Sequence, residues 1–155
     1  MTQLKIGQKA PDIKAENQFG ELVSLTDFKG KKIILFFYPK DNTPGCTAEA
    51  CNLNDNYIDL IEKGFVILGI SPDPVKSHKK FSDKFNFQYN ILADIDKKAL
   101  NDYGVWGEKN MYGKKYMGVL RTTFIISKEG KIEKIIEKVK TKDHTNQIFR
   151  ELQLD

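Results

Sequence analysis

The residues best suited to chemistry in this 155-residue chain are two cysteines five positions apart. The first, Cys46, follows Thr43, Pro44 and Gly45 in the segment PKDNTPGCTAEAC, which ends at Cys51. Thr43 is a favoured helix N-cap residue and Pro44 a favoured first helical residue, so this spacing places Cys46 in the first turn of a helix. Backbone N–H groups there lack partners and carry partial positive charge, and both features stabilise a thiolate. We therefore interpret Cys46 as a reactive thiol rather than a small packed residue.

Arg121 is the candidate for a positive charge beside this thiol. It is one of only two arginines among the 25 basic residues, and it opens the apolar stretch RTTFII, where an unpaired charge is costly. A guanidinium next to Cys46 would stabilise the thiolate further and would donate to a polar substrate oxygen. The alternative is a strand-end arginine that extends into water. Gly45 leaves the backbone open to close approach, and the Thr43 hydroxyl could bind the sulfur or a substrate oxygen.

Cys51 is the candidate partner thiol. The two cysteines form a C-x4-C pair rather than the C-x-x-C pair of thioredoxin-type oxidoreductases. With a reactive thiol five residues away, we interpret Cys51 as a resolving cysteine, and a buried helix cysteine is the alternative. A general disulfide oxidoreductase would use both thiols but would leave Thr43 and Arg121 without a role. A copper carrier would need a histidine ligand, and we expect His78 and His144 to lie exposed in lysine-rich helices.

The elements that must position these residues alternate between strands and helices. Continuous apolar runs predict buried strands, and helical spacing of apolar residues predicts amphipathic helices between them. We expect strands at 32–38, 65–71, 89–93, 122–127 and 131–137, helices at 43–62, 74–87, 96–103 and 143–152, and a hairpin over 12–25. This order predicts an α/β fold with a mostly parallel sheet, one antiparallel edge and helices on both faces. The cysteine segment follows the carboxyl end of strand 32–38, where open α/β sheets place their sites.

Composition narrows the class of protein. The length fits one domain over residues 1–155, and 40% hydrophobic with 30% charged residues is ordinary for a globular protein. The apolar runs are too short to cross a bilayer and the N-terminal residues lack the apolar region of a secretory signal, so we expect a cytoplasmic protein without a membrane partner. The net charge of +4 comes from dispersed lysines, which favours a mixed surface over a nucleic-acid site. Two cysteines alone do not fill a four-ligand zinc site.

Together these motifs resemble those of the peroxiredoxins. Pro39-x3-Thr43-x2-Cys46 with a distant Arg121 is similar to the active-site pattern of that family. The C-x4-C pair resembles the bacterioferritin-comigratory-protein subfamily, also called the PrxQ type. Further matching segments are Gly7-x2-Ala10-Pro11-Asp12, Tyr103-Gly-Val-Trp106, Met111-Tyr-Gly-Lys-Lys-Tyr-Met-Gly118 and Arg121-Thr-Thr-Phe124. The resemblance covers nearly the whole chain and departs at Ile13, where the family often has an aromatic residue.

The resemblance implies a thioredoxin-like fold, with a mixed central sheet flanked by helices and an N-terminal β-hairpin. It also implies a thiol peroxidase that reduces hydrogen peroxide and organic hydroperoxides without a metal or organic cofactor and is recycled by thioredoxin. By position, Cys46 would be the peroxidatic cysteine and Cys51 the resolving one, and the two would join in an intramolecular disulfide. Pro39 would shield the reactive sulfur, and Thr43 and Arg121 would bind the peroxide oxygens.

The resemblance also suggests roles for several supporting residues. Glu49 could hold Arg121 in place, although by itself it reads as an exposed helix charge. Gly45 would belong to the substrate-binding segment. Residues expected to form core or pocket wall without chemistry are Trp106, Met111, Tyr112 and Met117. We expect a monomer, with a weak dimer as the alternative.

An intact helix across the two cysteines would keep their thiols apart. Five helical residues rise ~7.5 Å and turn ~140°, so the Cα atoms of Cys46 and Cys51 would lie roughly 8.6 Å apart. A disulfide needs Cα atoms within about 7 Å. We therefore expect the helix to unwind in every cycle over residues 46–56, where asparagines are weak helix formers. The alternative is a helix that begins after Cys51 and needs no unwinding.

Overall fold

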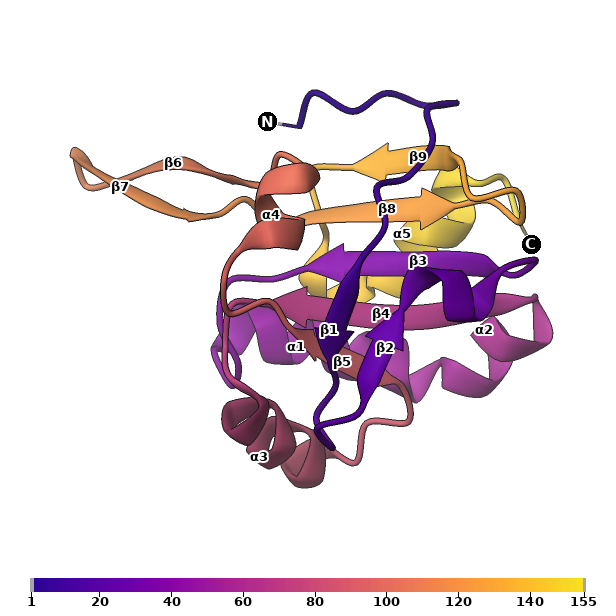
Figure 1. The fold of residues 1–155 in the computed structure, drawn as a ribbon, viewed down its shortest axis with the longest axis horizontal. Coiled ribbons are helices and arrows are strands. Elements are labelled where there is room, and N and C mark those ends of the chain that lie inside the picture. The colour runs from indigo at the N-terminus through magenta and orange to yellow at the C-terminus, as the bar shows by residue number, and fades with distance from the viewer. Residues whose placement is uncertain (1, 155) are drawn as a thin grey trace.

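The computed structural model describes residues 2–154 and is built around a mixed seven-stranded sheet (Figure 1). The order of its strands is β2-β1-β5-β4-β3-β8-β9, and β6 with β7 forms a separate two-stranded sheet. The strands are β1 (Lys14–Glu16), β2 (Leu22–Ser24), β3 (Lys32–Phe37), β4 (Phe65–Ser71), β5 (Asn90–Ala93), β6 (Trp106–Met111), β7 (Lys114–Val119), β8 (Thr122–Ile126) and β9 (Ile132–Ile136).

Parallel pairing is confined to the three central strands. β3 pairs in parallel with β4, and β4 with β5. Every other pairing in this sheet is antiparallel, including β3 with β8 and β1 with β5. The mixed sheet and the N-terminal hairpin are therefore confirmed, whereas the mostly parallel sheet with one antiparallel edge was wrong. The second antiparallel edge arises because β1 pairs with β5 through Glu16 and Ala93, a contact between distant segments that local patterns do not encode.

Helices cover both faces of the sheet, as expected. They are α1 (Pro44–Asp55), α2 (Tyr57–Glu62), α3 (Val75–Phe85), α4 (Lys98–Asp102) and α5 (His144–Glu151), with the 3-10 turns η1 (Leu25–Phe28) and η2 (Thr141–Asp143). The apolar cluster on one face includes side chains of α1, α2, α3 and α5, and the cluster on the other includes α4 and the N-terminal segment (Figure 1). Within residues 2–154, no helix combines the length and apolar character needed to span a membrane.

The expected helix over 43–62 is in fact two helices separated at Asn56. The Asn56 side chain donates a hydrogen bond to the Asn52 carbonyl at 2.8 Å, in competition with the helical backbone. The break leaves α1 as a three-turn helix that begins directly after the loop from β3. The segment that carries the two cysteines therefore forms a separate helix.

β3 connects the core to this segment. Ile33, Leu35 and Phe37 pack into one apolar cluster, while Ile34 and Phe36 pack into the other. This alternation buries both faces of the strand and explains its continuous apolar sequence. Because β3 is held on both faces and at both edges, the loop that follows Phe37 starts from a rigid support.

The hairpin of β6 and β7 projects from the body of the molecule and was not expected from the sequence (Figure 1). Tyr112 and Gly113 form its two-residue turn with φ values of 53° and 79°. A type I′ hairpin turn requires such positive φ values at both central residues. Met111, Tyr112 and Met117 are exposed, so their assignment to core or pocket wall was wrong. The two strands pair only with each other, and neither face of the ribbon is buried along its length. Trp106, at the base of the hairpin, does pack against the core.

Candidate active site

Cys46 lies in the first turn of α1, as the Thr-Pro-Gly sequence predicts. Thr43 occupies the N-cap position, and its carbonyl accepts the Thr47 N–H at 2.8 Å. The expected side-chain cap is absent, because the Thr43 hydroxyl donates to the Lys40 carbonyl at 2.8 Å instead. This bond holds the loop before the helix in place and leaves the lone pairs of the Thr43 oxygen available to accept a hydrogen bond.

Arg121 links the sulfur of Cys46 to a buried carboxylate. Its Nη2 donates to Cys46 Sγ at 3.2 Å, and its Nη1 donates to Glu49 Oε1 at 2.7 Å. Burial opposes the charge of Arg121, but Glu49 and Cys46 together raise the pKa of its guanidinium above the ordinary value. The alternative of an arginine that extends into water is wrong, since only 22% of its side chain is exposed.

The group that approaches the backbone of Gly45 closely is the guanidinium of Arg121. A Cβ atom at Gly45 would lie 3.3 Å from Arg121 Nη2, closer than most real Cβ contacts. The open backbone at this position therefore admits the guanidinium of Arg121. A larger residue would require that group to shift by a few tenths of an ångström.

Glu49 is fully buried, so the interpretation as an exposed helix charge was wrong. It follows Cys46 by three residues and thus lies on the same side of α1, where it contacts Arg121 and His144. That side carries Cys46, Glu49, Ala50 and Leu53, all of them buried. The two groups that Arg121 bridges are therefore presented by one helical turn.

Cys51 lies in the same helix but not beside Cys46. α1 is continuous from Pro44 to Asp55, so the alternative of a helix that begins after Cys51 is wrong. Both cysteines are free thiols, Cys46 buried and Cys51 half-buried. Burial and the nearby Asp55 raise the pKa of the Cys51 thiol. The structure is thus that of a reduced dithiol whose two sulfurs are held apart by the helix.

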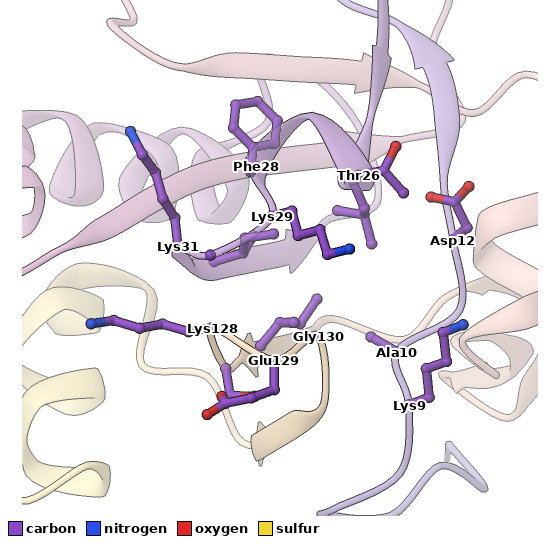
Figure 2. Close-up of a pocket in the computed structure, with 15 residues that line it drawn as sticks. Lys9, Ala10, Asp12, Thr26, Phe28, Lys29, Lys31, Lys128, Glu129 and Gly130 are labelled. Carbon is purple, nitrogen blue, oxygen red and sulfur yellow. The ribbon is translucent and has the colours of Figure 1, made fainter.

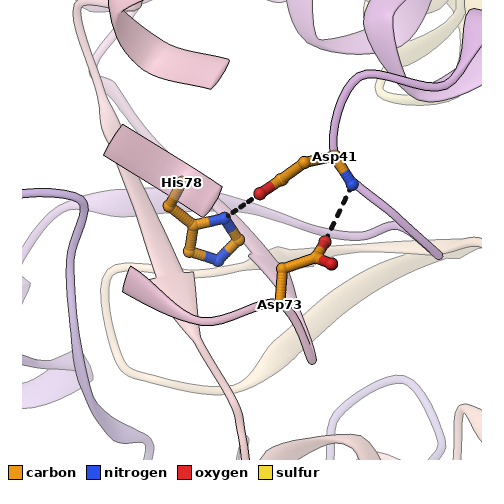
Figure 3. Close-up of side chains that lie close together, drawn as sticks. All are labelled: Asp41, Asp73 and His78. Carbon is orange, nitrogen blue, oxygen red and sulfur yellow. Dashed lines mark hydrogen bonds and ion pairs between the residues drawn. The ribbon is translucent and has the colours of Figure 1, made fainter. Parts of the chain in front are cut away.

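The loop from Pro39 to Thr43 rests on a buried polar network that the sequence did not reveal (Figure 3). Asp41 Oδ2 lies 2.7 Å from His78 Nδ1 and accepts a bond from the Ser77 hydroxyl, and Asp41 Oδ1 accepts the Tyr38 hydroxyl. The Asp41 N–H donates to Asp73 Oδ2 at 2.8 Å. Asp41, Asp73 and His78 lie close enough to form a three-ligand cluster, but both carboxylate oxygens of Asp41, both ring nitrogens of His78 and Oδ2 of Asp73 already have hydrogen-bond partners.

Both histidines are buried, which contradicts the expectation that they are exposed. A signal was present, because His78 follows Val75 by three residues and precedes Phe81 by three, on the apolar side of α3. His144 likewise precedes Ile148 by one turn. The ring nitrogens of both histidines are engaged in hydrogen bonds. The copper-carrier alternative therefore lacks a histidine with a free ring nitrogen.

We expect Asp41→Ala to lower the free energy of unfolding by roughly 3 kcal/mol, because it leaves a buried imidazole and two hydroxyls without their partner. Ser77→Ala is the matched control, since it removes one donor to the same carboxylate and should cost about 1 kcal/mol. Urea unfolding followed by circular dichroism measures both. Equal losses in the two variants would show that Asp41 does not organise the network.

The site is separate from a hollow at the other end of β3 (Figure 2). That hollow has a volume of about 470 Å³ and lies between η1 and the turn that joins β8 to β9. Its lining includes apolar side chains and four lysines, Lys9, Lys29, Lys31 and Lys128, but neither cysteine. Ile33, at the start of β3, belongs to this lining, whereas the loop to Cys46 leaves the strand from its far end.

Comparison with known proteins places these features in one family. Residues 6–135 match the AhpC/TSA family. The chain is 46% identical over 149 residues to Peroxiredoxin Bcp of Bacillus subtilis, covering 96% of this chain and 95% of that protein. It is 42% identical over 144 residues to Peroxiredoxin Bcp of Escherichia coli, covering 93% and 92% of the two chains. Among solved structures, Peroxiredoxin Q of Xanthomonas campestris superposes with a TM-score of 0.86 at 34% identity, over 98% of this chain and 97% of that one.

Proposed function

Because this chain belongs to the AhpC/TSA family, in which it is a peroxiredoxin of the Bcp or PrxQ type, we propose that its thiol peroxidase reaction takes place at Cys46. The observation that carries this proposal is the fork of Arg121, which donates to Cys46 Sγ with one arm and to Glu49 with the other. A charged, fixed donor at a buried sulfur stabilises a thiolate and faces the position where a bound oxygen would develop charge.

The proposed peroxide step is a displacement at oxygen. The Cys46 thiolate attacks the terminal oxygen of the hydroperoxide, the S–O bond forms, and the O–O bond breaks. The departing alkoxide or hydroxide takes a proton, and Cys46 is left as a sulfenic acid. Arg121 and the N–H groups at the start of α1 stabilise the growing negative charge. The Thr43 oxygen can accept the hydroperoxide O–H, because its own proton is already donated to Lys40.

Pro39 and Gly45 complete the proposed substrate-binding segment. Pro39 is half-buried in the loop between β3 and Thr43, where it would limit the access of water to the sulfur. Gly45 makes room for Arg121 beside Cys46. The alkyl peroxide reduction activity named for the Xanthomonas campestris bacterioferritin comigratory protein supports organic hydroperoxides as substrates together with hydrogen peroxide.

In the second step Cys51 would condense with the sulfenic acid. The S–S bond forms, the S–O bond of Cys46 breaks, and the oxygen leaves as water. A dithiol of the thioredoxin type would then return both thiols by exchange. Peroxiredoxins act on peroxides with reductants of this type, and thioredoxin itself is our proposal for this chain. A monomeric state, a single domain, a cytoplasmic location and the lack of a nucleic-acid partner remain predictions.

The continuity of α1 requires its first turns to open before this disulfide forms. In the intact helix the two Cα atoms lie roughly 8.6 Å apart, beyond the reach of a disulfide. The second half of the helix is anchored: Asn52 bonds to Lys142 and Thr145 of the C-terminal segment, and Asn54 bonds to Asn86 and Gln88. These asparagines tie the helix down, contrary to the expectation that they ease its melting. We therefore expect the opening to stop near Asn52.

Hydrogen exchange tests this expectation. Amides of residues 46–51, and those of 52–55 whose carbonyl acceptors lie in the opened segment, should exchange faster in the disulfide form than in the reduced form. The amides of Gln88 and Thr145, which donate to the side chains of Asn54 and Asn52, should keep their protection. The physical reason is that the disulfide excludes the helical hydrogen bonds of the first segment but leaves the asparagine anchors intact. Equal protection of 46–51 in both forms would contradict the proposed opening.

Coupled turnover tests the function itself. Thioredoxin, its reductase and NADPH are mixed with the protein, and NADPH consumption is followed after addition of hydrogen peroxide or an organic hydroperoxide. Peroxide-dependent consumption is the expected result. If a dithiol oxidant such as diamide forms the disulfide but hydroperoxides do not, the chain is a general disulfide oxidoreductase and not a peroxidase.

A further inference from the structure

One oxygen of the buried Glu49 carboxylate lacks a hydrogen-bond partner among the described residues. Oε1 accepts the bond from Arg121, whereas Oε2 is buried and receives no hydrogen bond. The nearest ionisable group to Oε2 is His144 of α5, whose Nε2 lies 3.4 Å away. Both side chains are completely buried.

The hydrogen bonds around His144 determine which of its nitrogens carries hydrogen. Gln147 accepts the Lys140 N–H through Oε1 and donates to the Lys138 carbonyl through Nε2, which fixes the orientation of its amide. His144 Nδ1 lies 2.9 Å from this Oε1 and must therefore be the donor. A neutral ring consequently presents a lone pair at Nε2, toward Glu49.

With a neutral His144 ring and an ionised Glu49, the cluster has one hydrogen-bond acceptor more than it has protons to donate. Two acceptors, Glu49 Oε2 and His144 Nε2, face each other, and the Thr123 hydroxyl, 2.8 Å from Nε2, has a single proton to donate. Whichever acceptor receives it, the other lacks a donor. One additional proton between the two side chains satisfies both, either on the carboxyl or on the ring.

The surroundings favour the carboxyl. The ionisable groups that face Glu49 are Arg121, which precedes β8, His144 of α5, and Tyr89, which precedes β5, with Cys46 one turn earlier in α1. Burial raises the pKa of Glu49 to about 7 even though Arg121 and the nearby Thr123 hydroxyl oppose the shift. Burial likewise lowers the pKa of His144 to about 4. Both directions keep the added proton on Glu49 and the ring of His144 neutral.

We propose that Glu49 and His144 share one proton in the reduced protein, and that this proton is released when Cys46 and Cys51 form their disulfide. The proposal rests on the function proposed above, because Glu49 lies between the two cysteines. Opening the helix over 46–51 withdraws Glu49 from both Arg121 and His144 and exposes it to water. An exposed glutamate has a pKa of about 4.3 and ionises at neutral pH.

The proton released by Glu49 is separate from the hydrogens that the two thiols give up on oxidation. Oxidation of the two thiols by hydrogen peroxide yields one disulfide and two waters, and the Glu49 proton passes to solvent. The reduced form binds this proton more tightly, so between the exposed pKa of about 4.3 and the buried value of about 7 it carries one proton more than the disulfide form. Raising the pH within this window therefore favours the disulfide, by about tenfold per pH unit beyond the contribution of the thiols.

His144 is thus a positioning residue. It does not touch the reacting atoms, but its Nε2 is placed to accept a hydrogen bond from the protonated Glu49 carboxyl. A neutral Glu49 still accepts the bond from Arg121 and leaves the guanidinium charge free to act on Cys46. Release of the proton on opening makes the return of the helix to its reduced geometry dependent on proton uptake.

The test is a proton count during oxidation. Reduced protein in weakly buffered solution is oxidised with one equivalent of peroxide, and in a parallel sample with diamide, while an indicator dye reports protons and a thiol assay reports completion. Glu49→Gln is the informative variant, because its amide can accept from Arg121 and donate to His144 without a titrating proton. Glu62→Gln, at an exposed glutamate, is the matched control.

Near pH 6 we expect wild type and Glu62→Gln to release close to one proton more than Glu49→Gln, and near pH 8.5 we expect no difference, as follows from a buried pKa of about 7. Equal counts at both pH values, with all thiols oxidised, would overturn the shared proton. If diamide forms the disulfide and peroxide does not, the proposed function fails while the proton count in the diamide sample still decides the inference.

A spectroscopic measurement keeps the inference testable if Glu49→Gln is poorly folded. In reduced wild-type protein near pH 6, infrared and ¹⁵N NMR spectra should show either a protonated buried carboxyl or a His144 ring protonated on both nitrogens. That signal should disappear on oxidation. An ionised Glu49 beside a singly protonated His144 in the reduced protein would contradict the proposal.

Discussion

Cys46→Ser is expected to abolish peroxide turnover, whereas Cys51→Ser is expected to react once and then stop. Only Cys46 lies in the first turn of α1 and accepts a hydrogen bond from Arg121, so only its sulfur has the stabilisation that a nucleophilic thiolate needs. Burial and Asp55 raise the pKa of Cys51, which favours its neutral thiol. A serine hydroxyl at position 46 cannot replace the thiolate, because its proton is not lost near neutral pH.

Single-turnover kinetics with trapping of the product measures this difference. Cys51→Ser should consume about one equivalent of peroxide and accumulate a sulfenic acid that dimedone labels at Cys46. Cys46→Ser should consume none and remain unlabelled. Equal reaction rates of the two single mutants with peroxide would contradict the assignment of unequal roles.

Arg121→Lys is expected to slow the peroxide step by about a hundredfold or more. The guanidinium donates to Cys46 Sγ and Glu49 Oε1 at once, through two nitrogens held in one plane. A lysine ammonium is a single point charge on a flexible stem and cannot keep both bonds in fixed directions. If it pairs with the buried Glu49, the sulfur and the developing oxygen charge lose their donor.

Stopped-flow measurement of the reduced protein with peroxide isolates this step from recycling. Arg150→Lys is the matched control, because Arg150 is the other arginine, lies exposed in α5 and, among the acidic groups of residues 2–154, contacts only Asp143, at 3.5 Å. It should react at the wild-type rate. Circular dichroism should show both variants folded, and a near-normal rate for Arg121→Lys would exclude the need for a planar fork.

The sequence was sufficient to predict the features that depend on neighbouring residues. Thr43, Pro44 and Gly45 predict a helix start because cap, proline and glycine preferences act within one turn. The apolar run of β3 predicts a strand buried on both faces, which the structure confirms. The position of Cys46 in that first turn follows from counting residues after the cap. Local propensities also predicted the hairpin of β1 and β2 and the boundaries of β4.

The pairing of Arg121 with Cys46 follows from the resemblance to peroxiredoxins and from no local rule, because 75 positions separate the two residues. The tertiary structure adds the reason for the contact, because β8 pairs with β3 and thereby delivers Arg121 to the carboxyl end of the strand that leads to Cys46. It also shows that Gly45 is the residue that leaves room for the guanidinium.

Burial of the polar residues was decided by the tertiary structure alone. Glu49, His78 and His144 look like solvated side chains in sequence, yet each is completely buried. Each lies on the side of its helix that packs against the sheet or another helix. The β6–β7 hairpin shows the opposite case, since Met111, Tyr116 and Met117 stay exposed where no element packs against the ribbon. Short-range preferences determine where a helix starts and which residues alternate along a strand. Which face meets a partner depends on contacts between distant segments, and that determines whether a carboxyl such as Glu49 holds a proton.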